Sequence, residues 1–299
     1  MKNKTQKVLD SIYNFFSFIN YMLAAFLSCA TPYPVSFFIG KNLALLWWIA
    51  RKNVSNVKIN VSKVLDLDPN DARVTKISKN IYFEFAKNIV DFFKNGIITL
   101  DQFKKNISIE GIDKLKKALE NGKGVVLFTA HIGNFEWGAS RIGAEGIKIW
   151  GVGLYRGNRF LDKYFEKNRK SKCLNTINAT KMLGVFRILK NNEVVAIPSD
   201  WDPTGSSKTY DFLNKKAKIP CGAIQIALAS GAPLIPSFIV RDGAYHHRQI
   251  ICEPLDLIRE GPKEELLEKN MQKIIKVLEK YITENLDQWV MFHNVWTRD

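Results

Sequence analysis

Hydrophobic and polar positions change their spacing along the chain, which divides it into two unlike stretches. Over residues 71–95, apolar side chains recur every three or four positions, and this predicts one long amphipathic helix that begins after the Asp68-Pro69-Asn70 turn. From about residue 107, short apolar runs alternate with helical stretches. An unbroken run such as 124–130 is typical of a strand that is buried on both faces of a sheet.

The second stretch predicts the order of its elements. We expect strands at 107–111, 124–130, 147–154, 194–198, 232–240 and 247–254, and helices at 113–122, from about 134, around 158–170 and 179–190, at 222–230 and at 263–284. Strands that alternate with helices indicate an α/β fold with a mostly parallel central sheet flanked by helices. We expect one domain over residues 53–299, in which the helical part 53–106 packs on the α/β body.

Residues 1–52 form a hydrophobic helical region whose relation to a membrane the pattern leaves open. No charged residue occurs between Asp10 and Lys41, and residues 11–30 are long enough to cross a hydrocarbon core of about 30 Å. Every third residue from Ser11 to Asn20 is polar, however, which suits a helix lying in the interface. A cleaved signal peptide and a hydrophobic hairpin that only packs on the domain are the remaining alternatives.

Charge and aromatic content favour membrane attachment. The net charge of +15 predicts acidic partners such as phosphates, an anionic membrane face, a nucleic acid or an acidic protein. Residues 41–63 contain five basic residues and no acidic one, and if residues 11–30 span the bilayer this excess places the rest of the chain in the cytoplasm. Nucleic acid is not an expected partner, because aromatic side chains are not interleaved with the basic run between residues 148 and 190.

The sequence contains few of the motifs that bind metals or cofactors. The four cysteines contain no CxxC pair and the four histidines are scattered, so neither a zinc ribbon nor a histidine metal centre is expected. Gly133 and Gly138 have P-loop spacing but lack the lysine that must follow. Residues 151–157 miss the dinucleotide fingerprint by one position, and no GxSxG nucleophile elbow occurs. The sequence predicts no metal site and no resident cofactor.

The sharpest chemical feature is the segment TAHIGNFEWGA at residues 129–139. His131 emerges at the carboxyl end of a buried strand, where open α/β sheets bind ligands. Gly133 permits a tight turn, and Asn134 can cap the helix that carries Glu136 in its first turn. The turn lets the imidazole fold back on the Glu136 carboxylate, which would fix the tautomer and leave the other ring nitrogen free to accept a proton from a hydroxyl. A structural histidine with an incidental HxxxxE spacing is the competing interpretation.

Two arginines follow the next predicted strand. Arg156 and Arg159 come directly after residues 147–154, on the same sheet edge as His131 if the strands are parallel. An arginine there can bind phosphate with two hydrogen bonds. Most lysines of the following helix are better explained as its solvated face.

Two aspartates follow the strand predicted at 194–198. Asp200 and Asp202 stand at its carboxyl end, but no further candidate ligands accompany them. A turn-forming or substrate-orienting role is therefore favoured over metal binding.

Together these blocks resemble the lipid A biosynthesis lauroyl/myristoyl acyltransferase family, within the wider lysophospholipid acyltransferase superfamily. The likeness runs over essentially the whole chain and keeps its order. Its blocks are Pro32-Tyr33, residues 56–68, HIGNFE (131–136), YRGNRFLDKYFEKNR (155–169), SDWDP (199–203), ALASGAPLIPSFIVR (227–241) and QWVMFHNVW (288–296). The chain departs from the family at residues 212–214 and 294–295, which leaves the acceptor open.

The resemblance implies an O-acyltransferase that moves a fatty acyl chain from acyl carrier protein to a hydroxyl of an anionic glycolipid such as a lipid A precursor. It also implies that the enzyme is located at the inner membrane, with its catalytic domain facing the cytoplasm. His131 would be the general base and Glu136 its partner. We expect the substrate-binding residues to be Gly133, Asn134, Arg156, Asn158, Arg169 and Asp200.

Direct transfer requires more than a base. Backbone amides of residues 133–135, or Arg156, would stabilise the oxyanion. An apolar groove must lie beside His131, because burying a dozen acyl carbons contributes roughly 9 kcal/mol at about 0.8 kcal/mol per methylene. Two alternatives stay open: an acyl-CoA-dependent glycolipid or phospholipid acyltransferase, and a non-catalytic basic protein that binds membranes or nucleic acid.

Overall fold

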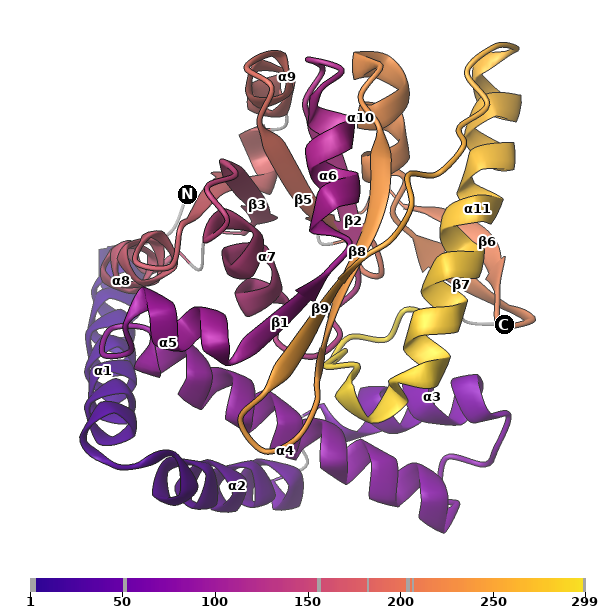
Figure 1. Cartoon of the computed structure of the whole chain (residues 1–299). Coiled ribbons are helices and arrows are strands. Elements are labelled where there is room, and N and C mark those ends of the chain that lie inside the picture. The colour runs from indigo at the N-terminus through magenta and orange to yellow at the C-terminus, as the bar shows by residue number, and fades with distance from the viewer. Residues whose placement is uncertain are drawn as a thin grey trace.

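The computed structural model describes residues 4–50, 53–154, 157–181, 183–202, 205 and 207–297. At its centre is a seven-stranded sheet with the strand order β1-β9-β8-β2-β5-β3-β4 (Figure 1). Neighbouring strands are parallel except for β8 and β9, which are antiparallel. The predicted α/β class with a mostly parallel sheet is confirmed.

The central strands are short and buried. β8 has all eight of its residues buried, as expected for a strand covered by helices on both faces. The bounds of the sheet strands are β1 (Ile107–Glu110), β2 (Val125–Thr129), β3 (Ile149–Gly153), β4 (Leu174–Asn178), β5 (Val194–Pro198), β8 (Leu234–Arg241) and β9 (His247–Ile251). β6 (Lys208–Phe212) and β7 (Lys215–Ile219) form a separate antiparallel hairpin.

Alternate residues of each strand face two different helical layers. Val125 and Leu127 pack with α6 and α7, whereas Val126 and Phe128 belong to the larger core with α9, α10 and α11. The bounds of these helices are α6 (Ile112–Leu119), α7 (Phe135–Gly143), α9 (Leu183–Lys190), α10 (Gly222–Ser230) and α11 (Lys263–Glu284). α8 (Arg159–Lys170) precedes β4 and closes the side of the sheet near α1.

Helices also form the first third of the chain. α4 is the amphipathic helix predicted at 71–95, and its N-cap Asp71 accepts a hydrogen bond from the backbone N–H of Arg73. α1 and α2 lie along two adjoining borders of the molecule and both contact α4 (Figure 1). The bounds are α1 (Lys4–Ala30), α2 (Tyr33–Ile49), α3 (Val54–Leu65), α4 (Ala72–Lys94) and α5 (Leu100–Lys105).

The register of the sheet decides which loops meet. β2 and β5 are parallel neighbours, with Thr129 opposite Pro198. β3 lies on the other side of β5, with Gly151 opposite Ala196. The carboxyl ends of β2, β5 and β3 therefore share one edge of the sheet, where ligands bind in open α/β folds.

Three features of the structure were not predicted. The sequence predicts no strand at β4 or at the β6–β7 hairpin, because each of these strands has only five residues and most of them are polar or only partly buried. The helix expected at 179–190 is a short 3-10 turn at Ala179–Lys181 followed by α9. The other predicted elements agree with the observed bounds to within a few residues.

Candidate active site

His131 lies two residues beyond β2, and its imidazole turns toward the end of β5. Its Nδ1 atom is 2.7 Å from Oδ1 of Asp200. Thr129 of β2 is opposite Pro198 of the parallel strand β5. His131 and Asp200, each two residues beyond its own strand, therefore lie side by side. The other ring nitrogen, Nε2, has no hydrogen-bond partner among the described residues, and His131 lines a cavity.

Asp200 holds both the ring and the main chain of His131. It is 2% exposed, and its Oδ2 accepts hydrogen bonds from the His131 backbone N–H and from Nε1 of Trp289, both at 2.8 Å. Burial alone would raise the pKa of Asp200, but the charge of His131 and these hydrogen bonds lower it below the usual range. The residue is therefore a carboxylate at neutral pH.

The same pair shifts the titration of the imidazole. Burial alone would lower the pKa of His131, but the charge and the hydrogen bond of Asp200 outweigh it, so the pKa lies above the ordinary value of 6.5. Above that pKa, Asp200 keeps the proton on Nδ1 and leaves Nε2 with a free lone pair. This is the geometry of a general base held in one tautomer.

The expected contact between His131 and Glu136 is wrong. Glu136 instead accepts two hydrogen bonds from Arg169 of α8, from Nε at 3.0 Å and from Nη2 at 2.7 Å. The reason is the turn after β2: Gly133 adopts φ +55°, and α7 begins only at Phe135. Glu136 is thereby directed to α8 while the ring of His131 stays at the end of β5. Both Glu136 and Arg169 line the same cavity as His131.

Gly133 and Asn134 build this turn. The N–H of Gly133 donates to the backbone oxygen of Gln288 at 2.9 Å, so it is not a free oxyanion donor, and that expectation is corrected. The Asn134 side chain caps α7 by accepting from the N–H of Trp137 at 3.3 Å, and it donates to Asp91 at 3.3 Å. Their contacts give both residues a structural role.

The predicted substrate-binding residues of the next block also differ from expectation. Asn158 is 4% exposed; it caps α8 and donates to the backbone oxygen of Asn14 in α1 at 2.7 Å. It therefore joins two helices. Arg156, proposed to bind phosphate or the oxyanion, lies outside the described residues.

A buried cluster of charged and polar side chains holds the turn that follows His131. Arg241 of β8 binds Glu84, Asn88 and Asp91 on one face of α4, at 3.0, 3.0 and 2.5 Å. Asn88 also donates to the backbone oxygen of Gly133 at 2.7 Å. Since Asn134 donates to Asp91 as well, α4 and β8 together fix the turn that follows His131.

A cavity of about 760 Å³ opens beside His131. This volume lies within the range of roughly 300–1,000 Å³ that is usual for small-molecule sites. Most of its lining is apolar or carries only a small side chain: Phe135, Ala139, Gly151, Val152, Gly153, Leu154, Leu174, Ala179, Ala196, Ile197, Pro198, Trp201, Pro220, Gly222 and Ile226. The apolar cleft required beside His131 is present.

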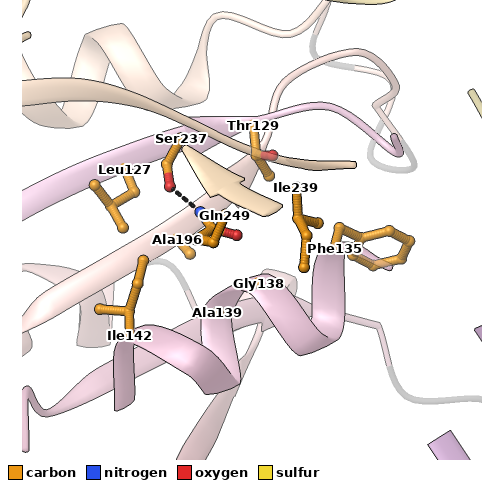
Figure 2. Close-up of a pocket in the computed structure, with 10 residues that line it drawn as sticks. All are labelled: Leu127, Thr129, Phe135, Gly138, Ala139, Ile142, Ala196, Ser237, Ile239 and Gln249. Atoms are coloured by element: carbon orange, nitrogen blue, oxygen red, sulfur yellow. Dashed lines mark hydrogen bonds between the residues drawn. The ribbon is translucent and has the colours of Figure 1, made fainter. Parts of the chain in front are cut away.

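A second, much smaller cavity lies between the sheet and α7 (Figure 2). Its volume of about 30 Å³ is enough for one water molecule. Gln249 donates to Oγ of Ser237 at 2.7 Å there, whereas its Oε1 has no partner among the described residues. Thr129, Ala139 and Ala196 line both cavities, so the two spaces share a wall.

Residues 289–293 complete the site, which the sequence had not indicated. Trp289 binds Asp200, and the backbone N–H of Val290 donates to the backbone oxygen of His131 at 2.8 Å. The ring of His293 stacks on Trp201, with centroids 4.1 Å apart and planes 4° apart. Burial, together with the charge of His131, lowers the pKa of His293. In the sequence, this segment stands out only as part of the resemblance to the acyltransferase family.

Metal ligands are not gathered at this site. Within the described residues, no group of three or more His, Cys, Asp or Glu side chains is placed to hold a metal ion. The chemistry that the geometry displays is that of a fixed imidazole beside an apolar cavity.

Comparison with known proteins assigns the family. A profile of the bacterial lipid A biosynthesis acyltransferases matches residues 1–298. The chain belongs to this family.

Two curated proteins are similar to this chain over different lengths. A lipid A biosynthesis palmitoleoyltransferase of Escherichia coli is 22% identical over 268 residues, which are 88% of this chain and 85% of that protein. A phosphatidylinositol mannoside acyltransferase of Mycobacterium tuberculosis is 30% identical over 138 residues. That match takes in 43% of this chain and only 42% of the mycobacterial protein, so the chain spans less than half the length of this relative.

Proposed function

We propose that the protein transfers a fatty acyl chain from a thioester to a hydroxyl of an anionic glycolipid, with His131 as the general base. One observation carries this proposal: Nδ1 of His131 is bound by the buried Asp200, while Nε2 is left unpartnered at a 760 Å³ apolar cavity. Family membership supports acyl transfer to a lipid.

The reaction balances without a covalent enzyme intermediate. Nε2 of His131 takes the proton of the acceptor hydroxyl as its oxygen attacks the thioester carbonyl. The tetrahedral intermediate then collapses, the carbon–sulfur bond breaks, and the thiolate leaves with the proton that His131 returns. The N-terminal end of α7, beside His131, offers a partial positive charge for the oxyanion.

The ion pair between Glu136 and Arg169 is placed where it can hold a substrate. Arg169 is 17% exposed and Glu136 21% at the side chain, and their ion pair lines the cavity. Burial lowers the pKa of Arg169, but the charge of Glu136 raises it above its usual range, so the guanidinium stays charged. We assign the pair to orienting the acceptor beside the imidazole.

The proposal also names the acyl donor, the class of acyl acceptor and the location of the enzyme. The net charge of +15 suits an acidic donor, for which we propose acyl carrier protein, with acyl-CoA as the alternative. Because the two relatives are named for different lipids, lipid A and a phosphatidylinositol mannoside, we propose an anionic glycolipid as the class of acceptor. We place the enzyme on the cytoplasmic face of the inner membrane, as the family resemblance implies.

Removing the imidazole tests the function. His131→Ala should lower acyl transfer roughly 10²- to 10⁴-fold, since general-base catalysis contributes about that much. Transfer is measured with a labelled acyl thioester and membrane glycolipid extract, and the product is identified by mass spectrometry. His246→Ala, in the β8–β9 turn, is the matched control and should keep full activity. Unchanged transfer by the His131 variant would refute His131 as the general base, and no transfer by the wild type itself would favour the alternative of a non-catalytic basic protein.

A further inference from the structure

α1 and α2 expose an apolar surface that no other part of the described chain covers. Phe16 and Phe26 of α1 are 62% and 67% exposed, and Phe38 and Ile49 of α2 are 69% and 65% exposed. Residues 11–30 are apolar and long enough to cross a membrane, yet only 6% of this segment is buried. Length and composition alone thus agree with a spanning helix.

The contacts of α1 contradict that interpretation. Near its start, Asn158 of α8 donates to the backbone oxygen of Asn14 at 2.7 Å. In the middle, Tyr21 packs against Phe165 of α8, with ring centroids 5.9 Å apart. At its end, Lys94 of α4 binds the backbone oxygens of Ser28 and Thr31. From Asn14 to its C-terminal end, α1 is therefore attached to the catalytic body.

A bilayer cannot surround such a helix without taking in its neighbours. α8 contacts α1 and lies beside it in Figure 1, and α8 carries Asp162, Lys163, Glu166, Lys167 and Lys170. Charged side chains at membrane depth are costly, and they are tolerated where they face protein or water. Spanning would require either burying these charges in lipid or breaking every contact between α1 and the body.

α2 is fixed in the same way. A Cβ on Gly40 would lie 3.5 Å from Val90 of α4, so the two helices are in close contact. Trp48 packs edge-on against Tyr82 of α4 at 5.5 Å. The apolar side chains of α2 that face outward therefore cannot turn inward without undocking the helix.

We propose that α1 does not cross the bilayer: α1 and α2 are inserted together into one leaflet, and the catalytic body stays on that same side. Charge identifies the occupant as an anionic lipid surface. Residues 11–65 contain five basic residues and no acidic one, which complements anionic headgroups. A second copy of the chain would bring two stretches of the same charge together and is disfavoured. The proposal specifies how the membrane attachment proposed above is achieved.

Topology mapping tests the proposal directly. The full chain is expressed in bacteria with a short epitope at each end, and protease is added to intact spheroplasts and to inside-out vesicles. We expect both epitopes to be cut in the same preparation and protected in the other. Cleavage of the two epitopes from opposite sides would show that α1 spans the membrane and would overturn the proposal. So would recovery of the protein in the soluble fraction.

Vesicle binding supplies a second measurement. Phe16→Gln/Phe26→Gln should weaken partition of the purified protein onto vesicles that contain anionic lipid by about tenfold or more, because each buried aromatic ring contributes strongly. Leu183→Gln is the matched control: Leu183 is 87% exposed on α9, away from α1 and α2, and its loss should leave partition unchanged. Equal binding by the α1 variant and the wild type, or a lipid-free dimer that only this variant disrupts, would refute insertion. Because His131→Ala leaves the surface intact, failure of this proposal and failure of the catalytic one are separable.

Discussion

Asp200 performs two tasks with one carboxylate, since its Oδ1 holds the His131 ring and its Oδ2 holds the His131 backbone. Replacing it by asparagine keeps the shape and removes the charge. We expect Asp200→Asn to lower the rate of acyl transfer roughly 10²- to 10⁴-fold, because the amide can present its N–H to Nδ1 and stabilise the wrong tautomer.

The pH profile separates this role from a structural one. In the wild type, kcat/KM should rise with pH through an apparent pKa above 6.5, since the raised pKa belongs to the His131 base. In Asp200→Asn the attractive charge is gone while the burial remains, so the residual activity should rise at a lower pH than in the wild type. An unshifted acid limb would contradict the assignment of Asp200 as the positioning partner.

The same shifts predict where this pair stabilises the fold. The raised pKa of His131 gives stability that is complete below the ordinary 6.5 and is lost as pH rises through the folded value. The lowered pKa of Asp200 gives stability that is present above the ordinary 3.8 and is lost as pH falls through the folded value. The pair therefore contributes most between these two limits.

At this scale the sequence singled out His131 but not the carboxylate that binds its imidazole. His131 was recognisable because it follows a buried strand, and so does Asp200, but 69 residues separate them. Neither spacing nor composition reveals that β2 and β5 are neighbours, whereas Glu136 is close in sequence and drew the assignment. Equal offsets of two residues beyond two strands of one parallel sheet were the available signal.

β3 is the element whose sequence best fits the cavity. Gly151 and Gly153 both line it, and a glycine inside a strand often marks the close approach of a ligand. A Cβ on Gly151 would make only ordinary van der Waals contacts, with Leu174 at 3.6 Å and with the backbone oxygen of Asn175 at 3.9 Å. The valine variant would therefore fill space that we assign to the acyl chain.

We expect Gly151→Val to shift the enzyme toward shorter acyl donors. Each methylene expelled from the cavity should lower kcat/KM about fourfold, which corresponds to roughly 0.8 kcal/mol. The measurement is kcat/KM over a series of acyl thioesters of increasing length, with the melting temperature as the control for folding.

The other side of the cavity provides the comparison. Gly222 lines it from α10 and has nothing within 4 Å of its Cβ position. Gly222→Val should leave the chain-length preference unchanged if the acyl chain lies between β3 and α7. A shift in this variant alone would place the chain on the α10 side instead.

Element by element, the predictable part of the fold was the part with strong periodicity. Long apolar runs identified β2 and β5, because a strand that is buried on both faces carries few polar residues. Apolar residues every three or four positions identified α4, because a helix that is buried along one side repeats with that spacing. The β6–β7 hairpin escaped because its burial alternates over five residues rich in lysine, and only its inward side chains are apolar. Its stability comes from packing that the local sequence does not encode, such as the contact of Phe212 with Trp296.

Across the whole molecule, one buried ionic cluster joins the N-terminal helices to the sheet. Arg241 is 3% exposed and Asp91 2% exposed at the side chain. Burial alone would raise the pKa of Asp91, but Arg241 and His247 lower it below its usual range. The cluster therefore loses its stabilising effect as the pH falls through that lowered value.

Breaking the cluster should be expensive. Arg241→Leu should lower the free energy of unfolding by about 3–5 kcal/mol, because it leaves buried carboxylates without their cation. Denaturant titration measures this, and Lys170→Leu is the control, since its ion pair with Glu166 is exposed and should be worth no more than about 1 kcal/mol. A loss below about 1 kcal/mol for Arg241→Leu would contradict the assigned role.

The pairing of Asp200 with Trp289, and of Gly133 with Gln288, has a consequence for biosynthesis. Every strand of the sheet and α11 leave the ribosome before residues 288–290 do, so a nascent chain can assemble most of its core while the imidazole still lacks its final supports. Under the proposed function, we expect a chain that ends before this segment to transfer acyl groups poorly, because its imidazole lacks these supports.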